Sequence, residues 1–285
     1  MRLDRLPRVR QFQNAGRTLV MGIVNVTPDS FSDGGDFLSA EAAIARGRQL
    51  LAEGADLIDV GGESTRPGAA RVPVQEELRR VLPVVAELVA AGAAVSIDTT
   101  RAEVAKAAVA AGADLVNDVS GGLADPAMLD VVAELGVGYV AMHWRGHSDV
   151  MQQLTHYDDV VRDVAAELAQ RRDTALAAGI APDRLVLDPG LGFAKTPDAN
   201  WTLLAGLDEL AALGQPLLIG ASRKRFLGDL LDGREPRQRD DASVALTALC
   251  AERGVWGVRT HTVRPHADAV AVVARLAEER RGGVQ

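Results

Sequence analysis

Eight short apolar runs, each followed by a longer segment with helical spacing, constrain the fold of this 285-residue chain most strongly. The runs are Leu19–Asn25, Leu57–Gly62, Val95–Asp98, Leu115–Asp118, Tyr139–His143, Leu185–Asp188, Leu217–Ser222 and Gly257–His261. A strand that is buried on both faces is continuously apolar, and parallel strands are joined by crossovers that are usually helices. Eight strand–helix units in a chain of this length predict an α/β protein, a (β/α)8 TIM barrel.

The segments between the runs carry the stop signals expected of helices. The predicted helices are Ala40–Glu53, Gln75–Ala91, Ala102–Ala111, Pro126–Leu135, Tyr157–Ala178, Asn200–Leu213, Asp241–Arg253 and Pro265–Arg280. Seven of the eight are followed by a glycine, which commonly ends a helix. An open doubly wound sheet is the alternative, but the first run lacks a GxGxxG motif. No linker divides the chain, which predicts a single domain over residues 1–285 with a short N-terminal extension, residues 1–17, and an exposed polar loop over Gly233–Asp240.

Composition and charge limit the kinds of ligand and partner that this chain could bind. The formal net charge of −8 argues against nucleic-acid binding, although a local positive pocket could still bind an anionic ligand. The one cysteine, Cys250, lies in an apolar helical segment and is expected to be buried, so neither a disulfide framework nor a cysteine zinc site is expected. No apolar stretch reaches the roughly 18 residues of a membrane span, and no signal-peptide core precedes the first run. We therefore expect a cytoplasmic protein without a membrane partner.

Polar side chains gather where the predicted strands end, which is where barrel enzymes build their active sites. In chain order they are Asn25, Glu63, Ser64, Thr65, Arg66, Asp98, Asn117, Asp118, Met142, His143, Asp188, Ser222, Arg223, Lys224, Arg259 and His261. Roughly half of such residues are helix caps or turn formers, and Asp118 and Thr99 are the clearest candidates for that role. The remaining set combines acidic and amide groups with basic groups on one rim.

The two kinds of charge suggest a ligand with two parts. Carboxylates and a side-chain amide suit a flat heterocycle with N–H groups and carbonyls, whereas Arg, Lys and His suit a phosphate or pyrophosphate. Asn25 and the carboxylates that follow it could bind Mg²⁺, which prefers oxygen ligands and substrate phosphates. In the polar loop after Asn25, Phe31 either closes over a ligand or attaches the loop to the barrel surface.

A nucleophile–base–orienter set is not evident in the sequence. Ser222 is followed by Arg223 and Lys224 without a GxSxG elbow. His143 ends a predicted strand and is either a base or a structural hydrogen-bond donor.

Eight motifs, in order along nearly the whole chain, resemble those of dihydropteroate synthases. They are MGIVNVTPDSFSDGG (21–35), DVGGESTRPGA (59–69), VSIDT (95–99), VNDVSGG (116–122), AMHWRG (141–146), LDPGLGFAKT (187–196), GASRKRFLG (220–228) and WGVRTH (256–261). The resemblance implies condensation of 6-hydroxymethyl-7,8-dihydropterin pyrophosphate with p-aminobenzoate, giving 7,8-dihydropteroate and pyrophosphate. It also implies Mg²⁺ as cofactor, SN1-like cleavage of the carbon–oxygen bond, and a homodimer with contacts late in the chain.

The resemblance also assigns site residues. It implies a pterin subsite of Asp98, Asn117, Met142, Asp188 and Lys224, and a pyrophosphate subsite of Asn25, Thr65, Arg66, Arg259 and His261, with Asn25 bearing on the metal. It implies a p-aminobenzoate pocket, where sulfonamides also bind, of Phe31, Pro67, Phe193, Ser222 and Lys224. Asp98, Lys224, Arg259 and His261 would carry the catalysis. Loops over residues 27–35, which include Asp33, and 64–71 would close over the site.

One motif departs from the family pattern, and two other functions remain possible. The family often ends RVHD where this chain has Arg259, Thr260, His261 and Thr262, so the hydrogen bonding around His261 needs another source. A pterin-dependent methyltransferase on the same fold would share the acidic and amide residues but would not need the basic ones. A non-catalytic pterin-binding paralogue would not need to keep the basic set either.

Overall fold

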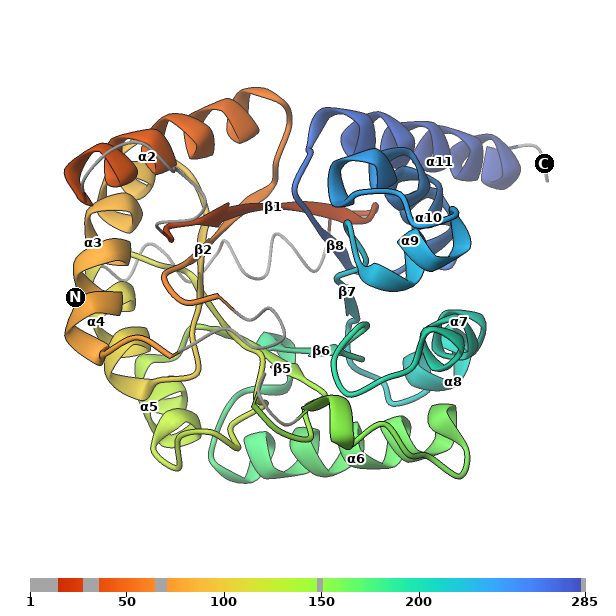
Figure 1. The fold of residues 1–285 in the computed structure, drawn as a ribbon, viewed down its shortest axis with the longest axis horizontal. Helices are drawn as coiled ribbons and strands as arrows, with labels where there is room; N and C mark the ends of the chain where they lie inside the picture. Colours follow the sequence, from red (N-terminus) through yellow and green to blue (C-terminus); the bar gives the residue numbers. More distant parts are fainter. Residues whose placement is uncertain (1–14, 28–35, 65–70, 148–150, 283–285) are drawn as a thin grey trace.

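The computed structural model describes residues 15–27, 36–64, 71–147 and 151–282. Its eight strands are β1 Leu19–Asn25, β2 Leu57–Gly61, β3 Val95–Asp98, β4 Leu115–Asp118, β5 Gly138–Met142, β6 Leu185–Asp188, β7 Leu218–Ile219 and β8 Gly257–Thr260. All pairings are parallel, in the order β6-β5-β4-β3-β2-β1-β8-β7, and a bridge between Leu187 and Leu217 links β6 to β7. The ring is closed, which confirms the predicted (β/α)8 barrel (Figure 1).

Helices surround the ring of strands, as Figure 1 shows. They are α2 Asp36–Ala52, α3 Val74–Ala90, α4 Ala102–Ala111, α5 Met128–Leu135, α6 Val160–Ala177, α7 Pro197–Ala205, α8 Leu207–Ala211, α9 Arg225–Leu230, α10 Asp240–Glu252 and α11 Arg264–Gly282, with short 3-10 helices at Met151–Gln153, Pro182–Arg184 and Pro236–Arg239. Gly112 (φ 113°) and Gly136 (φ 63°) end α4 and α5 in the left-handed conformation that the sequence predicted there. In the described part of the chain no helix is long and apolar enough to cross a membrane.

Two details of the prediction were wrong. The segment Asn200–Leu213 is two helices, which meet at Gly206, where a side chain would clash with Val161 of α6 at 2.8 Å. Helix α9 was not predicted, because a six-residue helix is too short to show helical periodicity. The loop 233–240 is largely exposed, as predicted, and it contains a 3-10 helix from which Arg239 donates hydrogen bonds to the backbone oxygens of Arg223 and Lys224.

The inward positions of the strands change from apolar to polar along the barrel axis. Near the N-terminal ends of the strands the core inside the barrel consists of Leu19, Met21, Leu57, Ala94, Leu115, Val140, Val186 and Leu218. Successive side chains on a strand point to opposite faces, so positions two residues further on face the same way. Those positions hold Asp59 after Leu57, Asn117 after Leu115 and Asp188 after Val186. Polar side chains thus follow the apolar layer at the C-terminal ends of the strands.

Candidate active site

The ends of β3, β4, β5 and β6 bring the predicted pterin residues into one ring. Asp98 lies opposite Asn117 in the sheet register, and Met142 lies opposite Asp188. All four are buried, with exposed fractions of 8%, 3%, 3% and 6% respectively. Neighbouring C-terminal strand ends therefore place two carboxylates, an amide and a thioether at the same level of the barrel.

The guanidinium of Arg259, from β8, lies between two carboxylates in this ring. Its Nε donates to Asp59 Oδ2 at 2.6 Å, and its Nη2 donates to Asp98 Oδ2 at 2.7 Å. Asp59 Oδ2 also accepts from Asn117 Nδ2 at 3.0 Å. Since the Asn117 amide nitrogen is engaged by Asp59, its carbonyl oxygen is the atom left to accept a hydrogen bond from a ligand.

Asp59 is a site residue that the sequence analysis missed, although one signal pointed to it. It is a fully buried carboxylate inside the apolar run Leu57–Gly62, and its Oδ1 has no hydrogen-bond partner in the described part of the chain. A charge within a strand that is buried on both faces needs a cationic partner. The search for that partner would have led to Arg259.

Burial and neighbouring charges shift the protonation of the ring. Burial raises the pKa of Asp98 well above its usual range, and the salt bridge with Arg259 opposes that shift. Burial also raises the pKa of Asp188 to about 6. The Gly190 N–H, which donates to Asp188 Oδ1 at 2.7 Å, and the charge of Lys224 both oppose that shift. Burial lowers the pKa of Lys224 to about 8. The site therefore holds groups whose charge depends on their immediate partners, as is common in catalytic centres.

Substituting Asp188 with Asn is expected to stabilise the fold increasingly as the pH rises. Because the folded-state pKa of Asp188 is raised to about 6, its contribution to stability is fully present below pH 4 and is lost as the pH rises through 6. The loss amounts to about 3 kcal/mol in all for a shift of this size, of which about 2 kcal/mol falls between pH 4.5 and pH 7.5, and the uncharged amide of the variant does not undergo it. Urea unfolding of both proteins at pH 4.5 and pH 7.5 measures the difference. A gap between the two unfolding free energies that does not change with pH would contradict this assignment.

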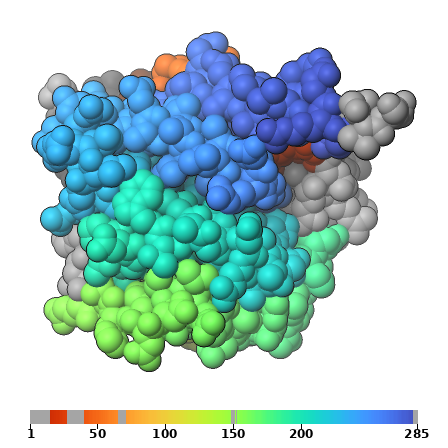
Figure 2. Space-filling model, turned by 90° about the vertical axis from the view of Figure 1, so that its right-hand side faces the viewer, coloured from red at the N-terminus to blue at the C-terminus, as the bar shows by residue number. Residues whose placement is uncertain are grey.

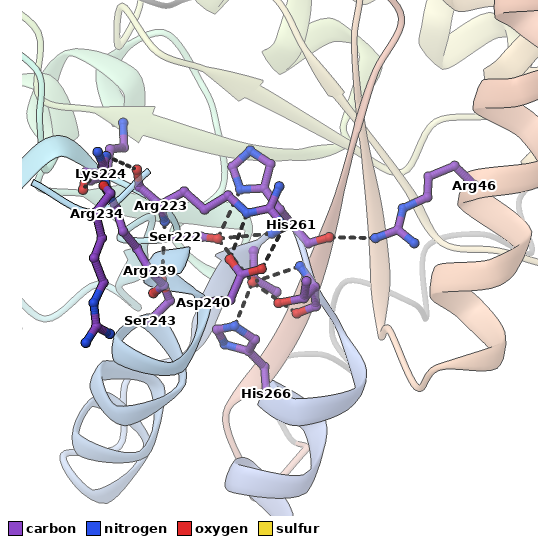
Figure 3. Close-up of polar contacts among 12 residues, drawn as sticks. Arg46, Ser222, Arg223, Lys224, Arg234, Arg239, Asp240, Ser243, His261 and His266 are labelled. Carbon is purple, nitrogen blue, oxygen red and sulfur yellow. Dashed lines mark hydrogen bonds and ion pairs between the residues drawn. The ribbon is translucent and has the colours of Figure 1, made fainter. Parts of the chain in front are cut away.

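His261 is held by Ser222 at the end of β8 (Figure 3). The backbone N–H of His261 donates to Ser222 Oγ at 3.2 Å, and Ser222 Oγ lies 3.0 Å from His261 Nδ1. Burial, with the charges of Arg223 and Arg259, lowers the pKa of His261 to about 3, so the ring is neutral at pH 7. When the Ser222 hydroxyl donates to Nδ1, the proton of the neutral imidazole lies on Nε2, from which it can be donated to a ligand.

The residue that departs from the family motif lies beside this pair. Thr262 is partly buried, and its Oγ1 has no hydrogen-bond partner in the part of the chain that the structure describes. The backbone oxygen of Thr262 accepts from Thr260 Oγ1 at 3.1 Å, and Thr260 Oγ1 also lies 2.9 Å from His266 Nε2. In this chain Ser222 orients His261, whereas Thr262 takes part in the hydrogen bonds beside it through its backbone oxygen.

Lys224 and Phe193, predicted to share a pocket wall, are in contact. Lys224 Nζ lies 4.1 Å from the centroid of the Phe193 ring, which is a cation–π distance. The preceding residue, Arg223, has a left-handed φ of 60° and forms a two-pronged ion pair with Asp240 at 2.7 and 2.8 Å. Figure 3 shows Arg223 directed toward Asp240. The turn after β7 thus directs one cation to a partly buried ion pair and the next to the aromatic ring of Phe193.

Several predicted site residues lie outside the described residues. They are Phe31, Asp33, Thr65, Arg66 and Pro67. The predicted metal ligand Asn25 is described: it ends β1 opposite Gly61 and is partly exposed at the barrel mouth.

Three strand-end residues have structural roles. Asp118 accepts hydrogen bonds from Ser120, Gly122 and Tyr139, which confirms that it forms a turn. Thr99 donates to Glu77 at 2.6 Å. His143 is 1% exposed, and both of its ring nitrogens are engaged, by Glu167 and by Lys195, at 2.9 Å each. Of the two roles considered for His143, the geometry favours the structural one.

The fold and the site define a pterin-binding enzyme built on a (β/α)8 barrel, and a family model described as "Pterin binding enzyme" matches residues 21–261. Dihydropteroate synthase of Mycobacterium leprae (strain TN) is 55% identical over 260 residues, which cover 89% of this chain and 92% of that protein. The Xanthomonas albilineans dihydropteroate synthase with 4-aminobenzoic acid has a TM-score of 0.86 at 51% identity and covers 92% of this chain and 93% of its own. The same enzyme in complex with 7,8-dihydropteroate gives 0.83 at 48% identity, with 92% and 94% covered. The chain belongs to the dihydropteroate synthase family.

Proposed function

We propose that this chain condenses 6-hydroxymethyl-7,8-dihydropterin pyrophosphate with p-aminobenzoate to give 7,8-dihydropteroate and pyrophosphate. The observation that carries the proposal is that acidic and amide side chains (Asp98, Asn117 and Asp188) and a group of basic side chains, here called the cationic rim (Lys224, Arg259 and His261), meet at one end of the barrel. The acidic and amide groups suit a heterocycle with several N–H groups, and the cationic rim suits a leaving group with several negative charges. The X. albilineans relative was solved with 4-aminobenzoic acid and with 7,8-dihydropteroate, which supports the second substrate and the product of the proposed reaction.

Asp98, Asn117, Asp188 and Lys224, beside Met142, form the pterin subsite in this proposal. Asp188 accepts from ring and exocyclic N–H groups, while Asn117, with its amide nitrogen on Asp59, accepts through its carbonyl oxygen. Asp98 lies beside Arg259 and is placed to offset positive charge that develops on the substrate. A pocket whose buried polar groups all need partners rejects an analogue that lacks the matching groups.

Arg259 and His261 hold the pyrophosphate, together with Thr65 and Arg66. His261 donates from Nε2 as a neutral imidazole, and Arg259 supplies the permanent charge. Mg²⁺, when bound, neutralises charge on the leaving group. Asn25 fits this cofactor, because it offers an amide oxygen at the partly exposed mouth, and magnesium takes few protein ligands when phosphate oxygens are available.

The reaction proposed is dissociative. The bond between the pterin methylene carbon and oxygen breaks, and its electron pair leaves with pyrophosphate, which the cationic rim stabilises. The resulting cation is delocalised into the dihydropterin ring and lies near the carboxylates of Asp98 and Asp188. The aryl amine nitrogen then attacks the methylene carbon and loses a proton. Closure of the loops 27–35, including Asp33, and 64–71 would exclude water, which competes with the amine.

Phe193, Ser222 and Lys224, with Phe31 and Pro67, form the p-aminobenzoate pocket and the sulfonamide site in this proposal. The aromatic face of Phe193 and the stem of Lys224 give the apolar wall that an aryl ring needs. Because Lys224 also interacts electrostatically with Asp188, it forms a boundary shared by the two substrates.

Isothermal titration tests the proposed subsites. The probe is the pterin alcohol without its pyrophosphate, titrated with and without inorganic pyrophosphate and Mg²⁺. Binding of the pterin that becomes tighter when pyrophosphate and Mg²⁺ are present is the expected result, since one mouth holds both. Independence from pyrophosphate would contradict the cationic subsite and favour the pterin-dependent methyltransferase or the non-catalytic paralogue.

A homodimer is also proposed, with the surface of α10 and α11 as its interface. These helices pack against each other and form the upper part of the face in Figure 2. Leu249, Val272 and Leu276 on them are exposed by 49%, 60% and 52%. Val272 and Leu276 are one turn apart, so they form an apolar stripe on α11 that a second copy would cover.

Leu276→Glu is expected to convert the dimer into a monomer without loss of helical content. A charge at the centre of an apolar interface is left unpaired and desolvated. Analytical ultracentrifugation should give twice the 30.0 kDa chain mass for the native protein and one chain mass for the variant. Arg162→Glu, on α6 and 78% exposed, lies outside these two helices; it is the matched control and should stay dimeric. A monomeric native protein would contradict the proposal.

A further inference from the structure

A buried lysine, Lys195, lies behind the aromatic wall of the site. It follows β6 in the loop that leads to α7, and it is 5% exposed. Its Nζ contacts three acceptors: His143 Nδ1 at 2.9 Å, the Gly190 oxygen at 3.1 Å and the Phe193 oxygen at 3.0 Å. Burial lowers the pKa of Lys195 to about 7, and the charge of Asp188 opposes that shift. In the protonated form all three N–H donors of the side chain are used, whereas the neutral amine leaves one of these acceptors without a donor.

The contact between Lys195 and His143 continues to helix α6. His143 Nε2 lies 2.9 Å from Glu167 Oε2, and a carboxylate can only accept there, so Nε2 carries the proton and Nδ1 accepts from Lys195. Burial and the charge of Lys195 lower the pKa of His143 to about 4, which keeps the ring neutral. Burial alone would raise the pKa of Glu167, but hydrogen bonds from His143 and Arg145 lower it to about 2. The result is a carboxylate–imidazole–ammonium row, Glu167–His143–Lys195, from α6 to the loop.

The loop that this row supports has a strained backbone. Gly190 and Gly192 have φ values of 66° and 78°, and Ala194, which is not a glycine, has 48°. Tyr157 donates to the Ala194 oxygen at 3.0 Å, and Arg145 lies 3.8 Å from the Tyr157 ring centroid. Left-handed conformations persist at non-glycine residues only where the surroundings fix them. Lys195, which donates to two backbone oxygens of the loop, is placed to fix this conformation.

The front of the same loop carries Phe193. Its backbone oxygen is bound by Lys195 on one side, while its ring lies against Lys224 on the other. The position of the Phe193 ring is therefore linked to a hydrogen bond at its own peptide group. A lysine that holds this peptide fixes the aromatic wall relative to Lys224.

We propose that Lys195, supported by His143 and Glu167, is a positioning residue that sets the position of Phe193 and thereby the affinity for the aryl amine. This inference rests on the proposed role of Phe193 in the p-aminobenzoate pocket. Lys195 touches no substrate in this account: it acts through the loop. Because loss of the Lys195 side chain leaves the pterin subsite in place, the KM values of the two substrates should respond differently.

The test measures both KM values and kcat at pH 6.5, where most of Lys195 is protonated, for Lys195→Met, which keeps the stem of the side chain and removes its donors. We expect the KM for p-aminobenzoate to rise about tenfold, while the KM for the pterin pyrophosphate changes less than about threefold, because the loss is in ground-state binding of one substrate. The chain has only three lysines, and Lys106→Met, at an exposed position on α4, is the matched control.

Two substitutions of His143 separate positioning from general stability. His143→Asn keeps an acceptor at the δ position for Lys195 and should retain most p-aminobenzoate affinity, whereas His143→Leu removes it and should resemble Lys195→Met. If Lys195→Met does not fold, the pair at His143 carries the test. Equal rises in both KM values, or a fall in kcat with both KM values unchanged, would overturn the inference.

Phe193→Ala distinguishes a failure of this inference from a failure of the pocket assignment. A raised KM for p-aminobenzoate in Phe193→Ala with an unchanged KM in Lys195→Met would overturn only the positioning role. An unchanged KM in both variants would overturn the assignment of Phe193 itself.

Discussion

Asp98→Asn is expected to reduce kcat by about 10²–10³-fold while the barrel remains folded. Asp98 is the carboxylate between Arg259 and the ring of pterin residues, and its negative charge would face the cation that forms when pyrophosphate leaves. Losing one preorganised electrostatic group of this kind typically costs that much in rate. The fold should survive, because burial raises the pKa of Asp98 and a neutral amide is less costly to bury than its carboxylate. Steady-state kinetics with both substrates and a circular-dichroism melt measure the two effects.

Ser96→Ala is the matched control for Asp98→Asn. Ser96 lies two residues earlier on β3 and is fully buried, and its Oγ has no hydrogen-bond partner in the described ranges. Its substitution should leave kcat close to that of the native protein. An unfolded Asp98→Asn protein would favour a structural role for the carboxylate, and an unchanged kcat would contradict its catalytic role.

The second large effect expected is a combined loss of pterin and p-aminobenzoate use in Lys224→Ala, with kcat/KM for each falling about 10²-fold or more. Lys224 lies against Phe193 in the proposed aryl-amine wall and interacts electrostatically with Asp188 and Asp98 in the pterin ring. Removing the Lys224 side chain therefore removes part of the wall of the p-aminobenzoate pocket and a positive charge from the pterin subsite. A hydrogen-bonded or charged group in a buried site contributes about 2–4 kcal/mol of transition-state stabilisation.

Arg225→Ala controls for the loss of a nearby positive charge. Arg225 follows Lys224, begins α9, and has 91% of its side chain exposed. It should keep nearly the native kcat/KM for both substrates. If Lys224→Ala raised the KM of only one substrate, the role of Lys224 as a shared wall would be wrong.

The barrel could be predicted from the sequence because each strand is a short apolar run bounded by polar residues. Strands β1, β3, β4 and β6 were predicted at their observed bounds, since their runs end at Asn25, Asp98, Asp118 and Asp188. The same residues mark the mouth of the barrel. The fold and the location of the site could thus be predicted from one signal, the change from apolar to polar residues at the C-terminal ends of the strands.

The contacts among the site residues could not be predicted from that signal. Arg259 was assigned to the pyrophosphate subsite and to catalysis, and its guanidinium bonds Asp59 and Asp98, 200 and 161 residues away along the chain. Helix α9 forms beside Lys224 although its six residues show no periodicity. Such contacts depend on how the barrel closes rather than on local spacing.

Lys195 shows how a site residue can be present in a motif and still be overlooked. It lies in the stretch LDPGLGFAKT, but its role depends on His143 and, beyond it, Glu167, which belong to other strand–helix units. One signal was available: only three of the 31 basic residues are lysines, and two of them, Lys195 and Lys224, follow strand ends. In a chain that uses arginine so widely, a lysine in such a motif indicates a position that favours a compact point charge.

Product formation tests the central claim most directly. Purified protein is mixed with Mg²⁺, the dihydropterin pyrophosphate and p-aminobenzoate, and dihydropteroate is followed by mass while pyrophosphate is followed by a coupled assay. The account predicts equal amounts of both products, in a reaction that a sulfonamide inhibits. Pyrophosphate without dihydropteroate would mean that the site ionises the pterin but does not seat the amine. Pterin binding without either product would contradict the synthase function and favour a non-catalytic pterin-binding protein.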